Sequence, residues 1–421
     1  MDKKVSHWDS VVSRFSGEAI SPVISPSFTV PEKSTIFTIG SCFARNIEEY
    51  LDVLGFNVPT LDFVAPFSES PNRPNGVLNK YTPTAIYEEL NWAMQDCDSE
   101  DDFIDSIQPF MFKDSNGIID LQLGYHTISE ERFIERRAEL YNLWQKVREA
   151  SCVTITLGLI ERWVDKSTGL SISGAPSTRS MLKERKRFEF SPLSYMESFN
   201  YVKKTIELIF RVAPKAKILI TTSPVPLQKT FKNEDVLIAN QASKSQLRTV
   251  CDEVVKEFEN VDYFPSYEMI AFPSPKVPFG KDLRHVRDNA VGDVITLLTK
   301  EYFNDVDETR RDLQLSLRDL SAKLKNTPAM ERVLSEIPIE ALNAKDALLY
   351  SRIAWRCNKR HIATEILLHY FNVAEPNARD LKALAYLANK CKLLNLFEDY
   401  LSQVIKVDPS NNRALQYLED I

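Results

Sequence analysis

The stretch Ser34–Leu54, STIFTIGSCFARNIEEYLDVL, decides the fold. A short apolar run ends at Gly40, and apolar residues then recur at the spacing of one helical face. This pattern predicts a buried strand, a glycine turn and the start of a helix. Ser41 and Cys42 fall in the turn, at the carboxyl end of the strand, where open α/β sheets bind ligands. Ser41 is the first candidate nucleophile, because unpaired N–H groups at a helix start also favour a developing anion.

Strand and helix signals alternate along the chain that follows. Cys152–Leu159 (CVTITLGL) and Lys217–Thr222 (KILITT) are rich in apolar and β-branched residues, which is typical of strands buried on both faces of a parallel sheet. Shorter strands are predicted at Phe56–Leu61, Gly117–Leu123 and Val261–Phe264. The alternation predicts an α/β fold, a doubly wound and mostly parallel sheet with helices on both faces.

The predicted domain organisation has three parts. Residues 1–33 are expected to form an irregular extension and residues 34–303 the α/β domain, and Arg162–Ser173 is expected to form a hairpin within it. From residue 304 to 421 the strand signals stop, and apolar residues recur at helical spacing. Asn395–Asn411 resembles the second helix and following turn of a tetratricopeptide repeat. An all-α C-terminal domain is therefore predicted.

Composition narrows the classes of function. The formal net charge is −7 and no block of five basic residues occurs, so nucleic acid is not an expected partner. No apolar run is long enough to span a membrane, and the first residues lack the apolar core of a secretory signal. The six scattered cysteines favour reduced thiols in the cytoplasm over a disulfide framework or a zinc site. The acidic run Asp96–Asp102 is interpreted as a solvated turn. No metal or other cofactor is expected.

A serine nucleophile needs a base, a group that orients the base, and donors for the oxyanion. Asp282 and His285 are three residues apart in a loop after the last predicted strand, a spacing that lets carboxylate and imidazole meet. Because that loop and the turn at Ser41 can both open at the carboxyl edge of the sheet, we expect these residues to form the catalytic centre.

Two other interpretations of this turn stay open. Ser41 is also a suitable residue to cap the helix that follows, and a capping serine occupies a similar place to a nucleophilic one. Cys42 is a rival nucleophile, because a thiol at a helix start can have a depressed pKa and could form a thioester. It is also a small side chain of a type that is often buried.

Gly40–Ala44 reads GSCFA, the pentapeptide that gives the GSCFA family its name, and the sequence resembles that family from about Thr35 to Phe303. The blocks that resemble the family beyond the pentapeptide are Asn79–Pro83 with Ile86, Thr156–Leu159 with Glu161 and Trp163, Ser223–Leu227, Asn240 with Ser243 and Lys244, Tyr263–Glu268, and Asp282 with His285. The family looks like a branch of the SGNH (GDSL-like) hydrolase superfamily. The resemblance implies an SGNH-hydrolase-like, flavodoxin-like three-layer fold for this part of the chain.

The resemblance also implies roles for single residues. Ser41 would be the nucleophile and its N–H an oxyanion donor, with His285 as general base and Asp282 as its orienting carboxylate. Gly76 is the nearest match to the superfamily's oxyanion glycine, with Asn79 behind it.

The third block departs from the superfamily pattern. Gly158 is followed by Leu159, Ile160 and Glu161 where Gly-x-Asn-Asp is usual, so a carboxylate stands where an amide donor is expected. An ionised carboxylate cannot donate a hydrogen bond, so either another group completes the oxyanion hole or Glu161 contacts polar groups of the substrate.

The leading hypothesis is an acyl-ester hydrolase or acyltransferase that forms a seryl ester at Ser41. The resemblance implies an acylated carbohydrate or a small ester as the substrate. A carbohydrate-linked acyl group is favoured, because the polar loop 72–79 can bind hydroxyl groups. The second hypothesis is a module that binds a glycan or peptide without turning it over, with a tail that docks a partner. The third is a scaffold in which residues 304–421 bind another protein or a second copy of the chain.

Overall fold

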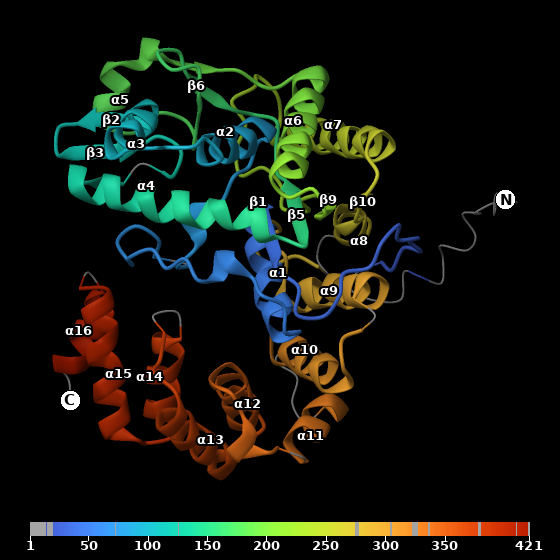
Figure 1. Ribbon diagram of the computed structural model, residues 1–421, viewed down its shortest axis with the longest axis vertical. Helices are drawn as coiled ribbons and strands as arrows, with labels where there is room; N and C mark the ends of the chain where they lie inside the picture. Colours follow the sequence, from blue (N-terminus) through green and yellow to red (C-terminus); the bar gives the residue numbers. More distant parts are fainter. Residues whose placement is uncertain are drawn as a thin grey trace, which may run out of the picture. The chain divides into compact units, whose positions relative to one another are not determined.

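The computed structural model describes residues 14, 20–71, 73–124, 126–273, 278–303, 305–321, 327–335, 337–377, 380–409 and 411–419 (Figure 1). Most of the predicted extension 1–33, Asn72 of the long polar loop, and residues 274–277 lie outside these ranges.

The chain divides into two compact units, which are described one at a time. The first unit is made of Met1–Glu48, Asn57–Thr60 and Leu78–Asn304. The second is made of Glu49–Phe56, Leu61–Val77 and Asp305–Ile421. Two short segments that precede Leu78 in the sequence therefore group with the helical C-terminal region. The boundaries at 34 and 304 remain a proposal.

The first unit contains the strands and most of the longer helices. Its strands are β1 (Ile36–Gly40), β2 (Met111–Asp114), β3 (Gly117–Asp120), β4 (Thr127–Ile128), β5 (Cys152–Leu157), β6 (Trp163–Asp165), β7 (Ser171–Ile172), β8 (Phe188–Phe190), β9 (Lys217–Thr222) and β10 (Val261–Tyr263). Its helices are the first half of α1 (Cys42–Val53), and α2 (Pro83–Ala93), α3 (Glu100–Ile107), α4 (Glu130–Gln145), α5 (Arg179–Lys183), α6 (Tyr195–Val212), α7 (Val236–Glu257), α8 (Ser266–Ala271) and α9 (Asp288–Tyr302).

The central sheet has the strand order β1-β5-β9-β10, and all its pairings are parallel. Every residue of β1 and β5 is buried. In the register, Ile39 lies opposite Ile155, which in turn lies opposite Ile220. The predicted parallel α/β sheet is confirmed.

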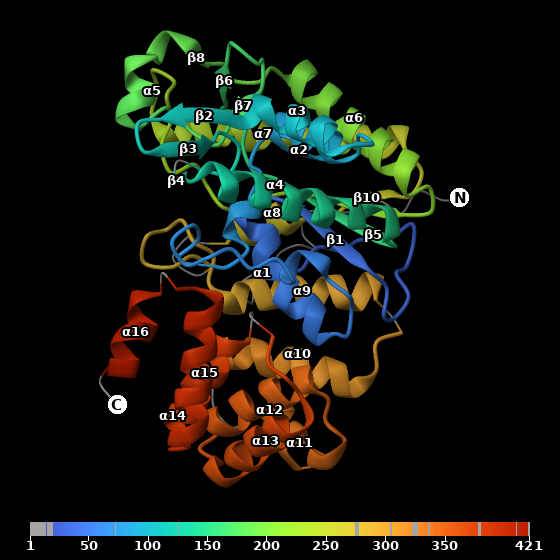
Figure 2. The same ribbon diagram turned by 60° about the vertical axis from the view of Figure 1, so that its left-hand side comes forward.

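Helices cover both faces of this sheet (Figure 2). Neighbouring residues of β1 point to opposite faces, so β1 contacts helices on each side. The ring of Phe37 packs against Trp144 of α4 at a centroid distance of 5.5 Å. On the other face the Thr38 hydroxyl donates to Glu48 of α1. Helices on both faces bury β1 and β5 throughout, which explains the near-continuous apolar runs in the sequence.

The strand predicted at Phe56–Leu61 is wrong. Asn57 makes an isolated parallel bridge to Thr35, and Pro59–Leu61 is a turn of 3-10 helix. Pro59 has no N–H to donate to a neighbouring strand, so pairing stops before it. The sheet consequently has β1 at its edge instead of a second strand beyond it.

Two small antiparallel sheets, β2-β3-β4 and β7-β6-β8, accompany the central one. The predicted hairpin at Arg162–Ser173 is confirmed as the β6–β7 pair, and β8 adds to it. The β7-β6-β8 sheet carries Trp163 and Phe190.

The second unit is all-helical in its C-terminal part, as predicted. Its described helices there are α10 (Glu308–Ser321), α11 (Pro328–Ser335), α12 (Ala344–Arg356), α13 (Arg360–Val373), α14 (Leu381–Lys390), α15 (Leu394–Val407) and α16 (Asn412–Glu419). Sequential helices pack in pairs, α12 with α13 and α14 with α15. The resemblance to a tetratricopeptide repeat stays a prediction. None of the helices within the described ranges has the length and apolar character needed to cross a bilayer.

Candidate functional site

A pocket opens where three parallel strands of the first unit end. Ser41 follows β1, Gly158 and Leu159 follow β5, and Ser223 follows β9, and all of them line a cavity of about 240 Å³. At roughly 30 Å³ per water molecule, this volume suits a small molecule or part of one. The carboxyl edge of a parallel sheet is the usual ligand site of an open α/β fold.

Ser41 lies in the wall of this pocket, with 1% of its surface exposed. Its hydroxyl accepts a 3.2 Å hydrogen bond from the Phe43 N–H and lies 3.1 Å from the Thr156 hydroxyl. The bond from Phe43 is that of a helix-capping serine, so Ser41 caps α1 in this structure. A capping serine can still act as a nucleophile. The Ser41 N–H donates to the carbonyl and hydroxyl oxygens of Thr156, at 3.1 and 2.9 Å, and is therefore not aimed at an oxyanion.

Asp282 and His285 form the predicted pair. His285 Nδ1 lies 2.5 Å from Asp282 Oδ2, and Asp282 Oδ1 accepts the N–H groups of Arg284 and His285, each at 3.1 Å. These bonds, the one from His285 first, lower the pKa of Asp282 to about 2. The two side chains are 51% and 66% exposed. Among the described residues, no hydrogen bond joins His285 to Ser41.

Arg284, between the two, is the residue of this loop that lines the pocket with Ser41. Its Nη1 lies 3.2 Å from His285 Nε2, the ring nitrogen that a general base would use. Leu283 has φ of +52°, and Gly280 donates its N–H to the His285 carbonyl at 2.8 Å. This tight turn presents the side chains of consecutive residues on different sides, so Arg284 faces the pocket while His285 is largely exposed.

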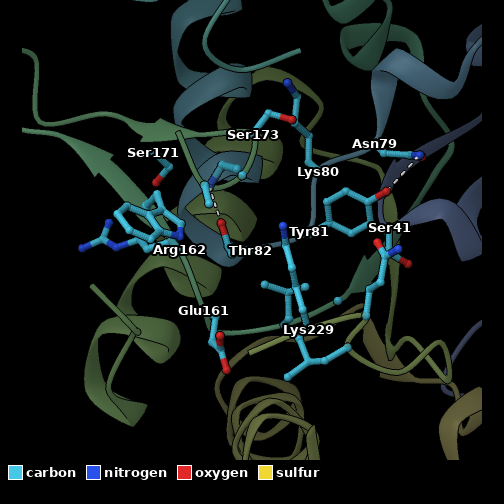
Figure 3. A pocket seen from close by; sticks show the side chains of 18 of the residues that line it. Ser41, Asn79, Lys80, Tyr81, Thr82, Glu161, Arg162, Ser171, Ser173 and Lys229 are labelled. Carbon is cyan, nitrogen blue, oxygen red and sulfur yellow. Dashed lines mark hydrogen bonds between the residues drawn. The ribbon is translucent and has the colours of Figure 1, made fainter. Parts of the chain in front are cut away.

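Asn79 and Tyr81 stand beside Ser41 (Figure 3). Asn79 Nδ2 donates a 3.3 Å bond to the Tyr81 hydroxyl, and Asn79 Oδ1 is buried without a hydrogen-bond partner in the described part of the chain. The Tyr81 carbonyl accepts the N–H groups of Gly158 and Leu159 at 3.0 and 2.9 Å. The Gly158 N–H is thus occupied. A side chain at Gly158 would place its Cβ 2.8 Å from the Tyr81 oxygen, so only glycine permits this approach.

Glu161 has a positioning role in this structure. Its two carboxylate oxygens accept the Thr230 hydroxyl at 2.7 Å and the Phe231 N–H at 3.1 Å. These bonds hold Phe231 against Trp163 and Phe190, with centroid distances of 5.2 and 5.7 Å, and both contacts line the pocket. Trp163 Nε1 is buried and has no hydrogen-bond partner among the described residues. In Figure 3, Arg162 of this end lies across the pocket from Ser41 and Asn79.

The remaining predicted site residues are Cys42 and Gly76. Cys42 is the first residue of α1 and lines the pocket next to Ser41. Gly76 belongs to the second unit, where it begins a turn of 3-10 helix and donates its N–H to the Arg73 carbonyl at 2.9 Å. That N–H is therefore occupied by a local bond. The role of oxyanion donor that the resemblance implies for Gly76 stays a prediction. No cluster of potential metal ligands is found within the described residues.

Lys244 of α7 is a buried lysine that contacts the pocket residue Gly158. Its Nζ donates to the Gly158 carbonyl at 2.5 Å, and burial lowers the pKa of Lys244 to about 7. The bond fixes the residue that follows β5, next to Ser41. Lys244 therefore positions the peptide between Gly158 and Leu159, which the sequence alone did not assign.

Glu88 of α2 supports the opposite wall. It accepts the Ser171 N–H at 2.9 Å, the Ser171 hydroxyl at 3.1 Å and the Gln122 amide at 3.0 Å, and both partners line the pocket. Burial raises the pKa of Glu88 to about 7, although the bonds from Ser171 oppose the shift.

This raised pKa predicts a pH-dependent stability. The folded chain holds a proton at Glu88 that the unfolded chain releases near pH 4.5, so the free energy of unfolding falls as the pH rises toward about 7, by up to about 3 kcal/mol. Glu88→Gln keeps the shape and should remove that part of the fall. Urea unfolding at about pH 5 and about pH 8 measures this difference in the free energy of unfolding for the wild type and for the variant. The exposed Glu207→Gln should leave the difference between the two conditions unchanged, and an equal response of both variants would contradict the assignment.

The fold and this edge pocket define an α/β protein with a ligand site at the carboxyl ends of β1, β5 and β9. Within that class the sequence model of the GSCFA family matches residues 35–297, and the chain belongs to the GSCFA family. No curated protein and no solved structure matches the chain.

Proposed function

We propose that this GSCFA protein is a serine-dependent ester hydrolase or acyltransferase of the SGNH superfamily, with Ser41 as nucleophile, His285 as general base and Asp282 as its orienting carboxylate. The observation that carries the proposal is the 2.5 Å contact between His285 Nδ1 and Asp282 Oδ2, in the loop whose Arg284 lines the Ser41 pocket. A carboxylate at Nδ1 holds the proton there and leaves the lone pair at Nε2 to accept another.

The proposed reaction has two steps. Ser41 Oγ attacks the ester carbonyl carbon while Nε2 of His285 takes the hydroxyl proton, and the resulting imidazolium returns that proton to the departing alcohol. Water, or a sugar hydroxyl in a transferase, then attacks the seryl ester, giving its proton to Nε2, which passes it back to Ser41. The products are the acid or transferred ester and the original serine.

The oxyanion needs at least one donor that the structure leaves accessible. We propose the Asn79 amide, because Ser41 and Gly158 already use their backbone N–H groups within the fold. Asn79 lines the pocket, and within the described ranges its Nδ2 makes one hydrogen bond, a long one of 3.3 Å. An amide in this place supplies the donor that is absent at Glu161.

The proposed substrate is an acylated carbohydrate or small ester. The rings of Trp163, Phe190 and Phe231 offer apolar surface at one end of the pocket, and Trp163 Nε1 is a donor with no acceptor among the residues that the structure describes. An apolar face beside an unused donor suits a sugar ring, whose flat side is apolar and whose edge carries hydroxyl oxygens.

Labelling with a fluorophosphonate tests the mechanism directly. We expect one equivalent of probe to attach to Ser41, identified by peptide mass spectrometry, since only an activated hydroxyl attacks the phosphorus. The label should be absent from Ser41→Ala and present in Cys42→Ala. Label on Cys42, or label at Ser41 that is unaffected by His285→Ala, would contradict the proposed roles.

A binding module is the second candidate, favoured by the resting geometry. Both polar groups of Ser41 have partners in the fold, and His285 Nε2 is in contact with Arg284. If the folded protein is not labelled and turns over no ester, a glycan- or peptide-binding role with a helical partner-docking tail replaces the enzymatic one.

A further inference from the structure

The pocket contains more positive charge than its own carboxylates neutralise. Its ionisable lining residues, apart from the phenol of Tyr81 and the thiol of Cys42, are Lys80, Glu161, Arg162, Lys229 and Arg284. Lys80 pairs with buried Glu89 at 3.1 Å and Arg162 lies 3.8 Å from Glu197. Glu161 has both oxygens engaged by Thr230 and Phe231. Lys229 and Arg284 make no ion pair with a carboxylate in the described ranges.

Arg284 is the better placed of these two cations. Arg284 lines the pocket together with Ser41, and its Nη1 lies 3.2 Å from Nε2 of the proposed base His285. Lys229 is exposed, with its Nζ 5.2 Å from the Phe231 ring centroid at the other end.

The guanidinium of Arg284 also has a buried N–H without an acceptor. Nε of Arg284 is buried and unpartnered in the described part of the chain. An unsatisfied buried donor is unfavourable, and an oxyanion bound to the guanidinium would relieve it. The guanidinium has the planar fork that matches a carboxylate or a phosphate.

The contact between Arg284 and His285 links this anion site to the base. Arginine has only N–H donors, so at 3.2 Å the Nη1 of Arg284 donates to the Nε2 lone pair of His285. That lone pair is the one a general base needs. As long as Arg284 holds it, His285 cannot accept the Ser41 proton.

We propose that the pocket binds an ester that carries a carboxylate or phosphate group, and that Arg284 binds this group and thereby releases Nε2 of His285. Arg284 is then a specificity-determining residue that couples substrate charge to activation of the base. Only the second part of this inference, the release of Nε2 of His285, rests on the proposed function, because the binding of an anion does not require turnover.

A matched pair of esters tests the proposal. Mono-4-nitrophenyl adipate and its methyl ester differ by one negative charge at the far end of the acyl chain. We expect the wild-type protein to favour the anionic ester by at least about 10-fold in kcat/KM, which corresponds to 1.4 kcal/mol. In Arg284→Gln the value for the anionic ester should fall and that for the neutral ester should rise, because the shorter, uncharged Gln side chain no longer holds a guanidinium against Nε2. Competition by adipate or by inorganic phosphate identifies the preferred group.

Lys281→Gln is the control, since it removes the same charge from the same loop at an exposed position outside the pocket. Its preference between the esters should match the wild type. Equal turnover of both esters by the wild type, or an equal fall of both in Arg284→Gln, overturns the inference and leaves the serine mechanism standing. If neither ester is turned over and Ser41 is not labelled, the proposed function fails. Calorimetric binding of monomethyl adipate that Arg284→Gln abolishes then supports the anion site, and its absence refutes it.

Discussion

Ser41→Ala is expected to lower kcat for 4-nitrophenyl acetate by at least about 10³-fold, because removing the nucleophile of such a triad leaves only binding and oxyanion stabilisation. The lost hydroxyl also caps α1 through its 3.2 Å bond to the Phe43 N–H. Loss of a cap destabilises by about 1 kcal/mol, which is small enough for the variant to fold. Circular dichroism and the urea midpoint confirm folding, and initial rates at saturating ester measure the loss.

Cys42→Ala separates the two candidate nucleophiles, which adjoin each other in the pocket. Its thiol belongs to the next residue of the same turn, so both variants perturb the same backbone. We expect Cys42→Ala to retain far more activity than Ser41→Ala. The reverse ranking would assign the chemistry to the thiol, and equal activity of both variants with the wild type would remove the active-site assignment altogether.

The elements that sequence alone predicted well are those in which one local pattern decides the structure. β5 and β9 read as continuous runs of buried residues because helices cover both faces of the sheet. The strand predicted at Phe56–Leu61 failed because Pro59 interrupts a run that was otherwise suitable.

The candidate site was predictable only where spacing determines contact. Asp282 and His285 meet because a turn of three residues brings them together, and the sequence showed that spacing. Periodicity does not indicate which side chain of a loop faces inward, so Arg284 was missed. The contacts of Glu161 were missed for another reason. Its partners Thr230 and Phe231 lie 69 and 70 residues away in the sequence, and only the fold brings them together.

Gly40→Ala is expected to be the most destabilising single change at the site. Gly40 has φ of +126° and pairs with Thr156 in the β1–β5 ladder. A Cβ there would lie within 2.2 Å of the Thr156 carbonyl oxygen and 2.7 Å of its hydroxyl oxygen. Two buried strands would have to separate at the point where Ser41 is held. We expect a loss of more than about 4 kcal/mol in the free energy of unfolding, at the exceptional end of single substitutions.

Gly124→Ala is the matched control for this change. Gly124 has a nearly equal φ of +129°, but no atom of the described part of the chain lies within 4 Å of the added Cβ. Substitution of Gly124 should therefore lower the free energy of unfolding only by the strain of an alanine at this positive φ, about 1–3 kcal/mol. Urea unfolding compares the two variants, and hydrogen exchange of peptides that cover β1 and β5 shows where protection is lost. Equal destabilisation by both substitutions would mean that the close approach of Gly40 to Thr156 is not required. A larger loss at Gly40, with β1 and β5 losing protection together, would show that the glycine of the GSCFA pentapeptide is needed to seat Ser41 against the sheet.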